Sequence, residues 1–393
     1  MAAGGATGSR STRVGYWLRH AAVVLAALAV VGGLIVASGI VPIKASAGHW
    51  PITRWFLSFA MARSVSTYSL PVRTPALDDP ALVLKGAGHY DFGCRPCHGS
   101  PGQRPPTIAL AMTPSPPYLP PAVAGWDPEE LFYIVKHGVK FTAMPAWPSL
   151  RRDDEVWAMV AFLRTLPRLD ATGYRRLVSG DETVGAEVAR VPGLPRPRHV
   201  PGAVRTSCGP CHGVDGHGRG LGAFPRLAGQ RPAYLLGSLE AYARGERHSG
   251  IMAPIAAGLG ADEMRELSGY YAGLPATAAH TVSRPDRAAR DLGETIAQRG
   301  VPGRRVPACA ACHGPGAAPR NPMYPQLAGQ YAEYLALQLR LFKDDRRGGT
   351  PYAHIMRMVA ARLTPEHIAA VAAYYASLPP ATEPPPLESR AAQ

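Results

Sequence analysis

The 393-residue sequence contains no cysteine outside three C-x-x-C-H segments. The cysteine pairs are Cys94/Cys97, Cys208/Cys211 and Cys309/Cys312, each followed directly by a histidine: His98, His212 and His313. No thiol is left for a separate disulfide framework. Every cysteine must therefore serve the chemistry of this repeated motif.

Lysine is also scarce, because five of the 42 basic residues are Lys and the rest are Arg scattered along the chain. The net charge of +14 is therefore not gathered into a basic stripe with interleaved aromatics, which nucleic-acid binding would favour. We expect no nucleic-acid partner. The 42 glycines and 41 prolines indicate many turns and irregular connections.

Charged residues are missing from residues 21–41, "AAVVLAALAVVGGLIVASGIV". This run is long enough to cross a bilayer as a helix. Because Arg10, Arg13 and Arg19 precede it, the positive-inside bias places residues 1–20 in the cytoplasm and the bulk of the chain on the periplasmic side of a bacterial cytoplasmic membrane. A signal peptide cleaved near Ala45-Ser46-Ala47 is the alternative, but the apolar run exceeds a usual signal core.

Aromatic side chains follow this run in residues 48–63, "GHWPITRWFLSFAMAR". Two interpretations are open. The segment could be a helix lying in the membrane interface, where aromatics are favoured, or it could pack on the first domain.

Alternating strand patterns of useful length are absent, whereas a tandem repeat is present. "FPRLAGQ" at 224–230 recurs as "YPQLAGQ" at 324–330, and the first cysteines of these two copies lie 101 residues apart. A more distant copy surrounds Cys94, and all three copies end in Leu-Pro after an apolar helical pattern. The sequence therefore predicts an all-α protein with three repeated units.

Helix-start signals support these units. Asp127-Pro128 followed by two Glu predicts a helix that ends at Gly138, and a last helix should run from Asp153 or Asp154 to Pro167. Asp262-Glu263 and Thr364-Pro365-Glu366 should open the equivalent last helices of the other units. The predicted segments are a cytoplasmic N-terminus (1–20), a transmembrane anchor (21–41), a juxtamembrane linker (42–80), the first unit (81–170), a linker (171–199), the second unit (200–276), a linker (277–291), the third unit (292–380) and a tail (381–393).

A C-x-x-C-H segment can serve zinc, a redox dithiol or haem. Structural zinc needs four ligands, whereas each unit offers one cysteine pair. A thioredoxin-like dithiol would need a βαβ setting, and strands are not expected. Haem uses the whole motif, because the thiols attach the macrocycle and the adjacent histidine binds the iron. We therefore expect three covalently attached haem c groups, whose apolar surface would also enlarge the thin cores of such small units.

Each unit offers a downstream methionine for the second axial position of the iron. These candidates are Met144, Met252 and Met356. Met358 competes with Met356, His248 and His354 are weaker alternatives, and Met159 on an apolar helix face should be core filler.

The proximal histidines should have their second ring nitrogen held by a backbone carbonyl. We expect Pro117, Pro225 and Pro325 to supply it. The loop to Pro117 is longer than the other two loops, and these prolines could equally be ordinary turn formers.

The motifs "CHG", "P-x-L-AGQ", Met before "AAGL" and "YYAxLP" resemble those of class I cytochromes c, and the tandem resembles the dihaem cytochromes of the c4 type over about 180 residues. "HGVKFTAMPAW" is similar to a class I methionine loop. The resemblance implies three class I cytochrome c domains with electron transfer and His/Met ligation of each iron. Three departures stand out: the additional first unit, the absence of a clear helix before Cys208, and Arg357-Met358 in place of Ala-Pro.

Two classes of function follow. The first is a membrane-tethered trihaem relay in a periplasmic respiratory chain, with a quinol-oxidising complex, a dehydrogenase or a terminal oxidase as redox partners. The second is the cytochrome subunit of a periplasmic dehydrogenase complex, or a haem enzyme such as a peroxidase. A peroxidase needs an open iron, which three methionine ligands disfavour. The sequence contains no flavin or quinone motif, so we expect no catalytic residues in this chain.

Overall fold

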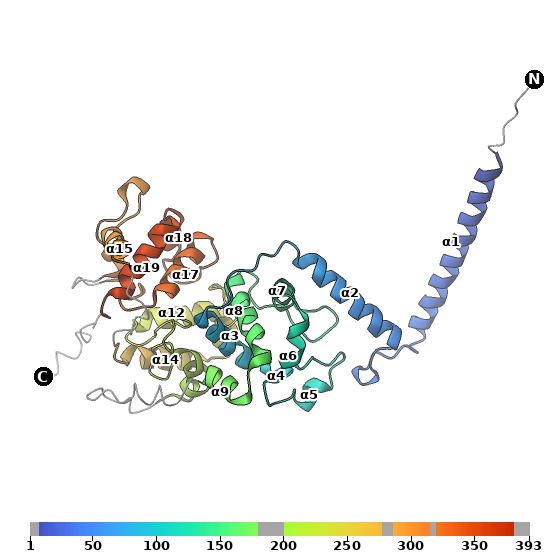
Figure 1. The fold of residues 1–393 in the computed structure, drawn as a ribbon, viewed down its shortest axis with the longest axis horizontal. Helices are drawn as coiled ribbons and strands as arrows, with labels where there is room; N and C mark the ends of the chain where they lie inside the picture. The colour runs from blue at the N-terminus through green and yellow to red at the C-terminus, as the bar shows by residue number, and fades with distance from the viewer. Residues whose placement is uncertain (1–7, 180–199, 277–285, 315–319, 381–393) are drawn as a thin grey trace, which may run out of the picture.

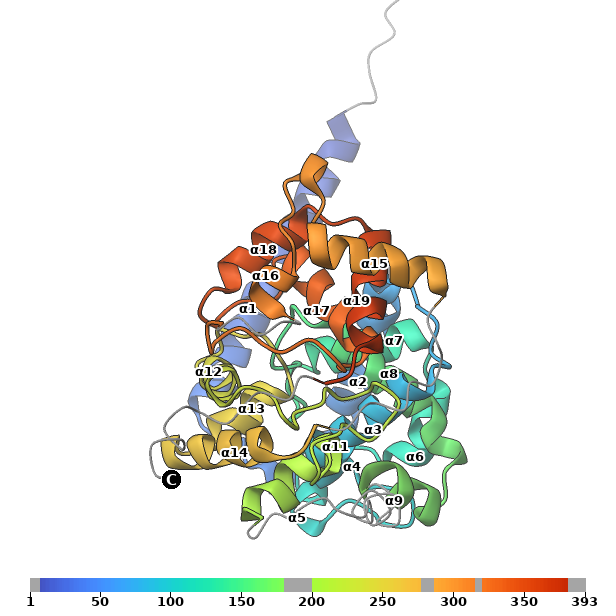
Figure 2. The ribbon, with the colours of Figure 1, turned by 90° about the vertical axis from the view of Figure 1, so that its left-hand side faces the viewer.

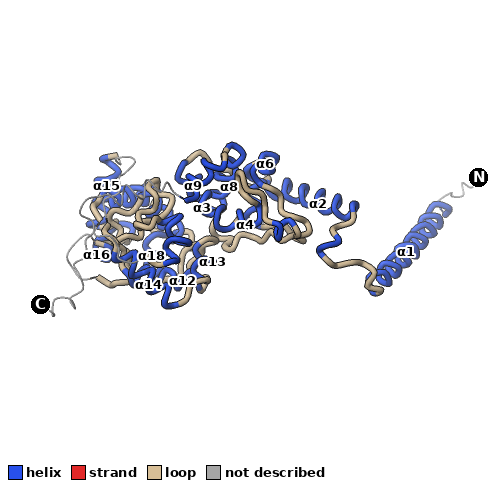
Figure 3. The backbone as a smooth tube through the Cα atoms, turned by 90° about the horizontal axis from the view of Figure 1, so that it is seen from below, coloured by secondary structure: helices blue, strands red, loops and turns tan. Residues whose placement is uncertain are grey.

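The computed structural model describes residues 8–179, 200–276, 286–314 and 320–380. Within these ranges the chain is helical and contains no strand, as Figure 3 shows. Two isolated bridges, Ser100–Gln103 and Val301–Val306, are the extended pairings found there. The all-α prediction is confirmed for the part of the chain that is described.

The apolar segment near the N-terminus forms α1 (Gly8–Ala37), which stands apart from the body of the molecule (Figure 1). Its stretch Val14–Ala37 is long and apolar enough to cross a membrane. The predicted span 21–41 overlaps this helix, which begins earlier than residue 21 and stops at Ala37. It stops there because Gly39 turns the chain with φ +69°.

Helix α2 (Pro51–Ser69) lies in the segment predicted to be a juxtamembrane linker. Its C-terminal half packs on the first unit, where Ser66 Oγ donates to Glu130 Oε1 at 2.7 Å and the rings of Tyr68 and Tyr133 stack 5.9 Å apart. Its N-terminal half leaves its aromatic side chains uncovered. Trp50, Trp55, Phe56 and Phe59 are each more than half exposed.

Seven α-helices build the first unit and its C-terminal extension. They are α3 (Pro80–Gly93), α4 (Arg95–His98), α5 (Thr107–Leu110), α6 (Leu119–Ala122), α7 (Pro128–His137), α8 (Asp153–Thr165) and α9 (Ala171–Ser179), with short 3-10 turns η2 (Val123–Gly125) and η3 (Leu166–Arg168). Helix α7 begins and ends as predicted: the Glu130 carboxylate accepts from the Asp127 amide, and Gly138 turns the chain with φ +66°. The predicted start of α8 is also confirmed.

Helices α3 and α8 cross closely at Gly86. A Cβ at this glycine would lie 2.0 Å from the carbonyl oxygen of Ala158, so no larger residue fits without separating the helices. Tyr90, Met159 and Phe162 are completely buried beside the crossing, which confirms Met159 as a core side chain.

Residues 171–179, predicted to be a linker, form α9 and pack on α3. Tyr174 and Val178 are buried four residues apart on one face of α9, and Tyr174 Oη donates to Asp91 Oδ1 at 2.7 Å. Because Tyr174 and Val178 have the spacing of one helix face, residues 171–179 form a packed helix and not a linker. Residues 180–199, where a helix before the second motif would lie, are outside the described ranges.

The second and third units are built from equivalent elements. The second contains a π-helical turn η4 (Val204–Cys208), α11 (Gly209–His212), α12 (Pro232–Ala243), α13 (Met252–Ala257) and α14 (Ala261–Gly273). The third contains α15 (Arg287–Arg299), η5 (Pro302–Arg304), α16 (Ala310–His313), α17 (Ala332–Lys343), α18 (Ala353–Ala361) and α19 (Pro365–Ser377). Helix α15 therefore begins inside the predicted linker 277–291, and α14 and α19 open at the predicted signals.

The "LAGQ" segments of the two tandem units exchange hydrogen bonds. The Gln230 amide bonds the main chain of Gln326, with Nε2 to O at 3.0 Å and N to Oε1 at 2.8 Å. Gln330 makes the same pair of contacts, both of 3.0 Å, with the main chain of Arg226. Figure 2 shows the two units adjoining. Equivalent glutamines of the two units therefore make equivalent hydrogen bonds to the other unit, as in a contact with approximate two-fold symmetry.

Candidate functional site

Each C-x-x-C-H segment forms one short helical turn: α4, α11 or α16. Residues at i and i+3 lie on the same side of a turn, so the two thiols of each pair face the same way with the histidine beside them. A glycine in the left-handed region ends each turn: Gly99, Gly213 and Gly314 have φ of 70°, 79° and 80°. Each motif therefore places two thiols and one imidazole close together on a single helical turn.

The motif histidines have their Nδ1 atoms held by the expected carbonyls. The distances are 2.9 Å from His98 to Pro117, 3.1 Å from His212 to Pro225 and 3.0 Å from His313 to Pro325. A carbonyl only accepts, so Nδ1 must carry the proton and Nε2 keeps its lone pair. Burial lowers the pKa of all three imidazoles, and the carbonyl bond opposes this shift. Each ring is therefore neutral and oriented as a metal ligand.

A buried tyrosine fixes the glycine that follows each motif. Tyr90 Oη donates to Gly99 O at 2.7 Å, Tyr271 Oη to Gly213 O at 3.2 Å, and Tyr375 Oη to Gly314 O at 2.8 Å. This role of the three tyrosines was not among the predictions from the sequence. Its signal for the tandem units was the paired tyrosine of "YYAxLP", whereas the first unit uses its N-terminal helix α3.

Burial raises the pKa of the Cys94 and Cys211 thiols to about 12 and of the Cys208 and Cys309 thiols to about 11. A catalytic dithiol or a zinc thiolate requires the opposite shift. No group of three or more His, Cys, Asp or Glu within the described residues could hold a metal ion. Zinc and dithiol chemistry are therefore disfavoured.

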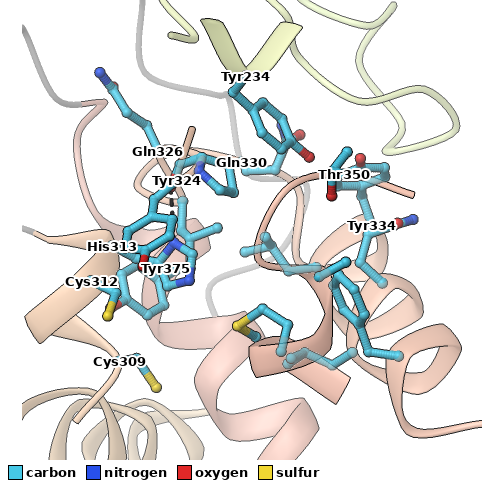
Figure 4. A pocket seen from close by; sticks show the side chains of 18 of the residues that line it. Tyr234, Cys309, Cys312, His313, Tyr324, Gln326, Gln330, Tyr334, Thr350 and Tyr375 are labelled. Carbon is cyan, nitrogen blue, oxygen red and sulfur yellow. Dashed lines mark hydrogen bonds between the residues drawn. The ribbon is translucent and has the colours of Figure 1, made fainter. Parts of the chain in front are cut away.

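A cavity of about 150 Å³ opens beside the third motif. Cys309, Cys312 and His313 line it together with Tyr324 and Tyr375, and Figure 4 shows Tyr334 and Thr350 on its opposite side. Most of the remaining wall is aliphatic, including Leu335, Leu339, Val359 and Leu363. An apolar cavity with two thiols and a free imidazole nitrogen on one wall fits a covalently attached haem.

The two thiols of the first motif have different surroundings. Both cysteines are half-buried, but Cys94 packs against the hydrophobic core of the first unit, and the Cys97 amide donates to Cys94 O at 3.1 Å. Both thiols are free. The cavity lies at the third motif, so it does not reach Cys97. The assignment of Cys97 as the second haem attachment of this unit therefore stays a prediction from the motif spacing.

The candidate methionines are all partly buried, and Met356 lines this cavity. Met358 is 55% exposed. His354 is exposed, and the carbonyl of His248 accepts from Arg152 Nη1 at 2.8 Å. In the third unit these positions favour Met356 over Met358 and His354 as the axial ligand, and the assignments of Met144 and Met252 stay predictions.

Two buried arginines gather at the contact of the tandem units. Arg247 Nη2 donates to Tyr334 Oη at 3.3 Å, and Arg347 Nη2 donates to Tyr234 Oη at 2.9 Å, so each arginine reaches into the other unit. Burial alone would raise the pKa of Tyr234, but the Arg347 and Arg247 guanidiniums outweigh it and lower this pKa to about 7.

Neither arginine has a carboxylate partner within the described residues, and Arg347 Nε is buried without a hydrogen bond. Burying an unpaired cation is costly. Arg347 lines the cavity, so its positive charge without a carboxylate partner fits the carboxylates of a haem.

Comparisons with known proteins agree with this chemistry. A family model described as "Cytochrome c" matches residues 292–379, and one described as "Cytochrome C oxidase, cbb3-type, subunit III" matches residues 81–163. A thiosulfate dehydrogenase electron acceptor from Thiomonas intermedia is 38% identical over 44% of this chain and 79% of its own length. Cytochrome c4 from Thiocapsa roseopersicina is 36% identical over 44% of this chain and 86% of its own.

Among solved structures, reduced recombinant cytochrome c4 from Pseudomonas stutzeri aligns with a TM-score of 0.39 at 29% identity. That alignment covers 51% of this chain and 99% of the other.

Proposed function

We propose a function from the premise that this chain belongs to the cytochrome c family, as a multihaem class I cytochrome with a tandem of the cytochrome c4 type. Its function is electron transfer. In our proposal the chain carries three haem c groups, one in each of three cytochrome c domains, and relays single electrons between periplasmic redox proteins. The repeated geometry supports this most directly, since three motif histidines each keep a free Nε2.

The residues that would hold each haem act in the same way in the three units. The cysteine pairs would attach the macrocycle through thioethers, and the imidazoles of His98, His212 and His313 would ligate the iron. Met144, Met252 and Met356 would close the opposite face. Haem so ligated accepts and returns single electrons without binding substrate. The protein residues keep the ligands oriented, bury the macrocycle and exclude water from the iron.

The proposed site of action is the periplasmic face of a bacterial cytoplasmic membrane, with α1 retained as a single-pass anchor. Support comes from its 24-residue candidate span and from the arginines before it. The exposed aromatics of α2 follow directly and suit the membrane interface. A tethered relay would hold its haems close to membrane-bound partners.

The electron donor in our proposal is a periplasmic dehydrogenase. The similarity to thiosulfate dehydrogenase electron acceptors favours this class of donor. The match of the first unit to a family of oxidase subunits favours a terminal oxidase as the acceptor. A quinol-oxidising complex remains the alternative donor.

The second candidate is a stable cytochrome subunit of a dehydrogenase complex, which the same relatives favour. Purification of the tagged chain from its native membrane separates the two candidates. A dehydrogenase that co-purifies in equal amount supports the subunit, whereas a chain that purifies alone and reduces or oxidises added partners supports the relay.

Haem content tests the first step of the proposal. Expressed with a cytochrome c maturation system, the purified chain should carry three haems that survive acid-acetone extraction, counted by pyridine haemochrome absorbance against protein mass. Changing Cys208 and Cys211 together to Ser should remove one of the three. Extractable haem, or a count below three in the wild type, contradicts the trihaem proposal.

A further inference from the structure

Glu155, on α8 of the first unit, is a buried carboxylate at the contact between the first and second units, and its side chain is 3% exposed. Its two oxygens accept three hydrogen bonds and take part in one ion pair, with partners on both sides of this contact. We infer that Glu155 is a positioning residue that holds the methionine loops of the first two haem sites in a fixed relation. This inference rests on the proposed function, in which Met144 and Met252 ligate iron.

Two chains of hydrogen bonds leave Glu155, one toward each unit, and we call them its two arms. The arm toward the second unit ends at the amide of Met252. Ser249 Oγ donates to Glu155 Oε1 at 2.6 Å, and the Gly250 amide donates to Oε2 at 2.6 Å. Because the single hydroxyl proton of Ser249 goes to the carboxylate, its lone pairs are free to accept. They accept the amides of Met252 at 3.0 Å and Ile251 at 3.2 Å. Glu155 thereby sets the start of α13, where Met252 is the first residue.

The arm toward the first unit passes through Trp147, three residues after Met144. Trp147 Nε1 donates to Glu155 Oε2 at 3.2 Å, while the Trp147 amide donates to Lys136 O at 3.0 Å. The Val139 amide donates to Met144 O at 3.2 Å, which closes the loop that carries this methionine. The indole is buried and cannot turn away, so its position follows that of the carboxylate.

The two methionine loops also touch directly. A Cβ added at Gly250 would lie 2.1 Å from Trp147 Nε1, so the second-unit loop runs across the face of this indole. Arg152 completes the contact: its Nη1 lies 3.0 Å from Glu155 Oε1 and 2.8 Å from His248 O. The guanidinium therefore neutralises the buried carboxylate and bonds the second unit's loop just before Ser249. A shift of either loop must be passed to the other through this cluster.

Three substitutions separate the two arms. Ser249→Ala removes the bond to the Met252 amide, Trp147→Phe removes the indole donor while keeping an aromatic ring, and Glu155→Gln disturbs both arms because an amide nitrogen then faces two donors. Glu263→Gln is the control, since Glu263 is an exposed carboxylate of the second unit that caps α14 through the Gly260 amide at 2.9 Å.

The readout is the proton NMR spectrum of the reduced full-length chain in detergent. Haem-bound methionine methyls give separate, strongly shifted signals, assigned here with Met144→Ala, Met252→Ala and Met356→Ala. We expect Ser249→Ala to move the Met252 signal, Trp147→Phe to move the Met144 signal and Glu155→Gln to move both. In each case added imidazole should also replace the affected methionine on the iron at a concentration about tenfold lower than in the wild type, as expected for one lost hydrogen bond. The Met356 signal is the internal reference and should stay in place.

The inference is overturned if Glu155→Gln leaves the Met144 and Met252 signals unchanged, or moves all three signals together. Should Glu155→Gln fail to fold, the two single-arm variants decide alone, and unchanged signals in both overturn it. A wild-type chain without shifted methionine signals contradicts the proposed function instead, so the two failures are distinguishable.

Discussion

Met356 and Met358 stand two residues apart on α18, and their surroundings differ. Met356 lines the cavity that holds Cys309, Cys312 and His313, whereas Met358 is 55% exposed. A side chain directed to solvent loses no contact when it is shortened. A ligand that closes the sixth position of the iron leaves that position open when it is removed.

We therefore predict that Met356→Ala opens one haem in three to carbon monoxide. Met358→Ala should leave carbon monoxide binding as low as in the wild type. The measurement is a titration of the reduced protein followed in the Soret band. Binding in Met358→Ala with none in Met356→Ala would assign the ligand to the other methionine.

At the scale of elements, the N-terminus of α8 joins the units through charged side chains. Arg152 bonds both oxygens of Asp154 at 2.8 Å, and Lys85 Nζ lies 3.4 Å from Asp154 Oδ2. Burial would raise the pKa of Asp154, but its hydrogen bonds to Arg152 and the nearby Lys85 outweigh burial and hold it well below the usual range.

A carboxyl whose pKa is depressed by folding stabilises the protein above its unfolded pKa, about 3.9 for Asp, and loses this contribution as the pH falls further. We predict that Asp154→Asn lowers the free energy of unfolding by about 3 kcal/mol at pH 7, since it removes the carboxylate that Lys85 and Arg152 share. The difference from wild type should shrink below pH ~4. Chemical denaturation at several pH values measures both effects. Asp262→Asn is the control, because that side chain is 96% exposed, and an equal loss there would contradict the explanation.

Helix α2 has two halves with different surroundings. The half near α7 packs on the first unit, whereas the half that follows α1 exposes a stripe of aromatics in which Trp55 and Phe59 stack 5.7 Å apart. Exposed aromatics beside a membrane span favour the interfacial position proposed above.

In vesicles with brominated acyl chains, we expect lipid quenching of tryptophan fluorescence. Changing Trp50 and Trp55 together to Phe should reduce the quenched fraction. Trp157→Phe is the matched control because this indole stacks on Phe132 at 4.3 Å inside the first unit. Equal quenching in the double variant and the wild type would contradict the proposed position of α2 at the membrane surface.

For the whole molecule, the charge that faces partners is positive. Residues 1–41 hold three Arg and no acid, so subtracting them from +14 leaves +11 on the remainder. Haem carboxylates would reduce this value without reversing its sign. A positive surface steers acidic partners at low salt, and the effect is largely screened near ~0.15 M.

We accordingly predict that electron transfer to an acidic acceptor slows several-fold as ionic strength rises from about 10 to 150 mM. Stopped-flow reduction kinetics at constant pH provide the measurement. A rate independent of salt would show that docking is apolar or that the partner is held permanently beside the anchor.

Features that depend on neighbours along the chain could be predicted from the sequence alone. The cysteine pairs and their histidines are one helical turn each. The starts of α7 and α19 follow from a capping residue, Pro and Glu in the first turn, and the start of α8 follows from the acidic residues of its first turn. The carbonyls of Pro117, Pro225 and Pro325 were also predictable, because each lies within 19 residues of its histidine.

Contacts between residues far apart in the chain became known from the three-dimensional fold. Glu155 meets Ser249 across 94 residues, and Arg347 meets Tyr234 across 113. No local pattern marks such pairs, since each side chain alone is equally suited to a solvated surface. The packing of α9 on α3 and the exposure of Met358 were likewise set by which neighbours the fold brings near. Spacing along the chain therefore predicted the candidate ligands. The side chains that position these ligands, such as Glu155, could be identified only from the packing between units.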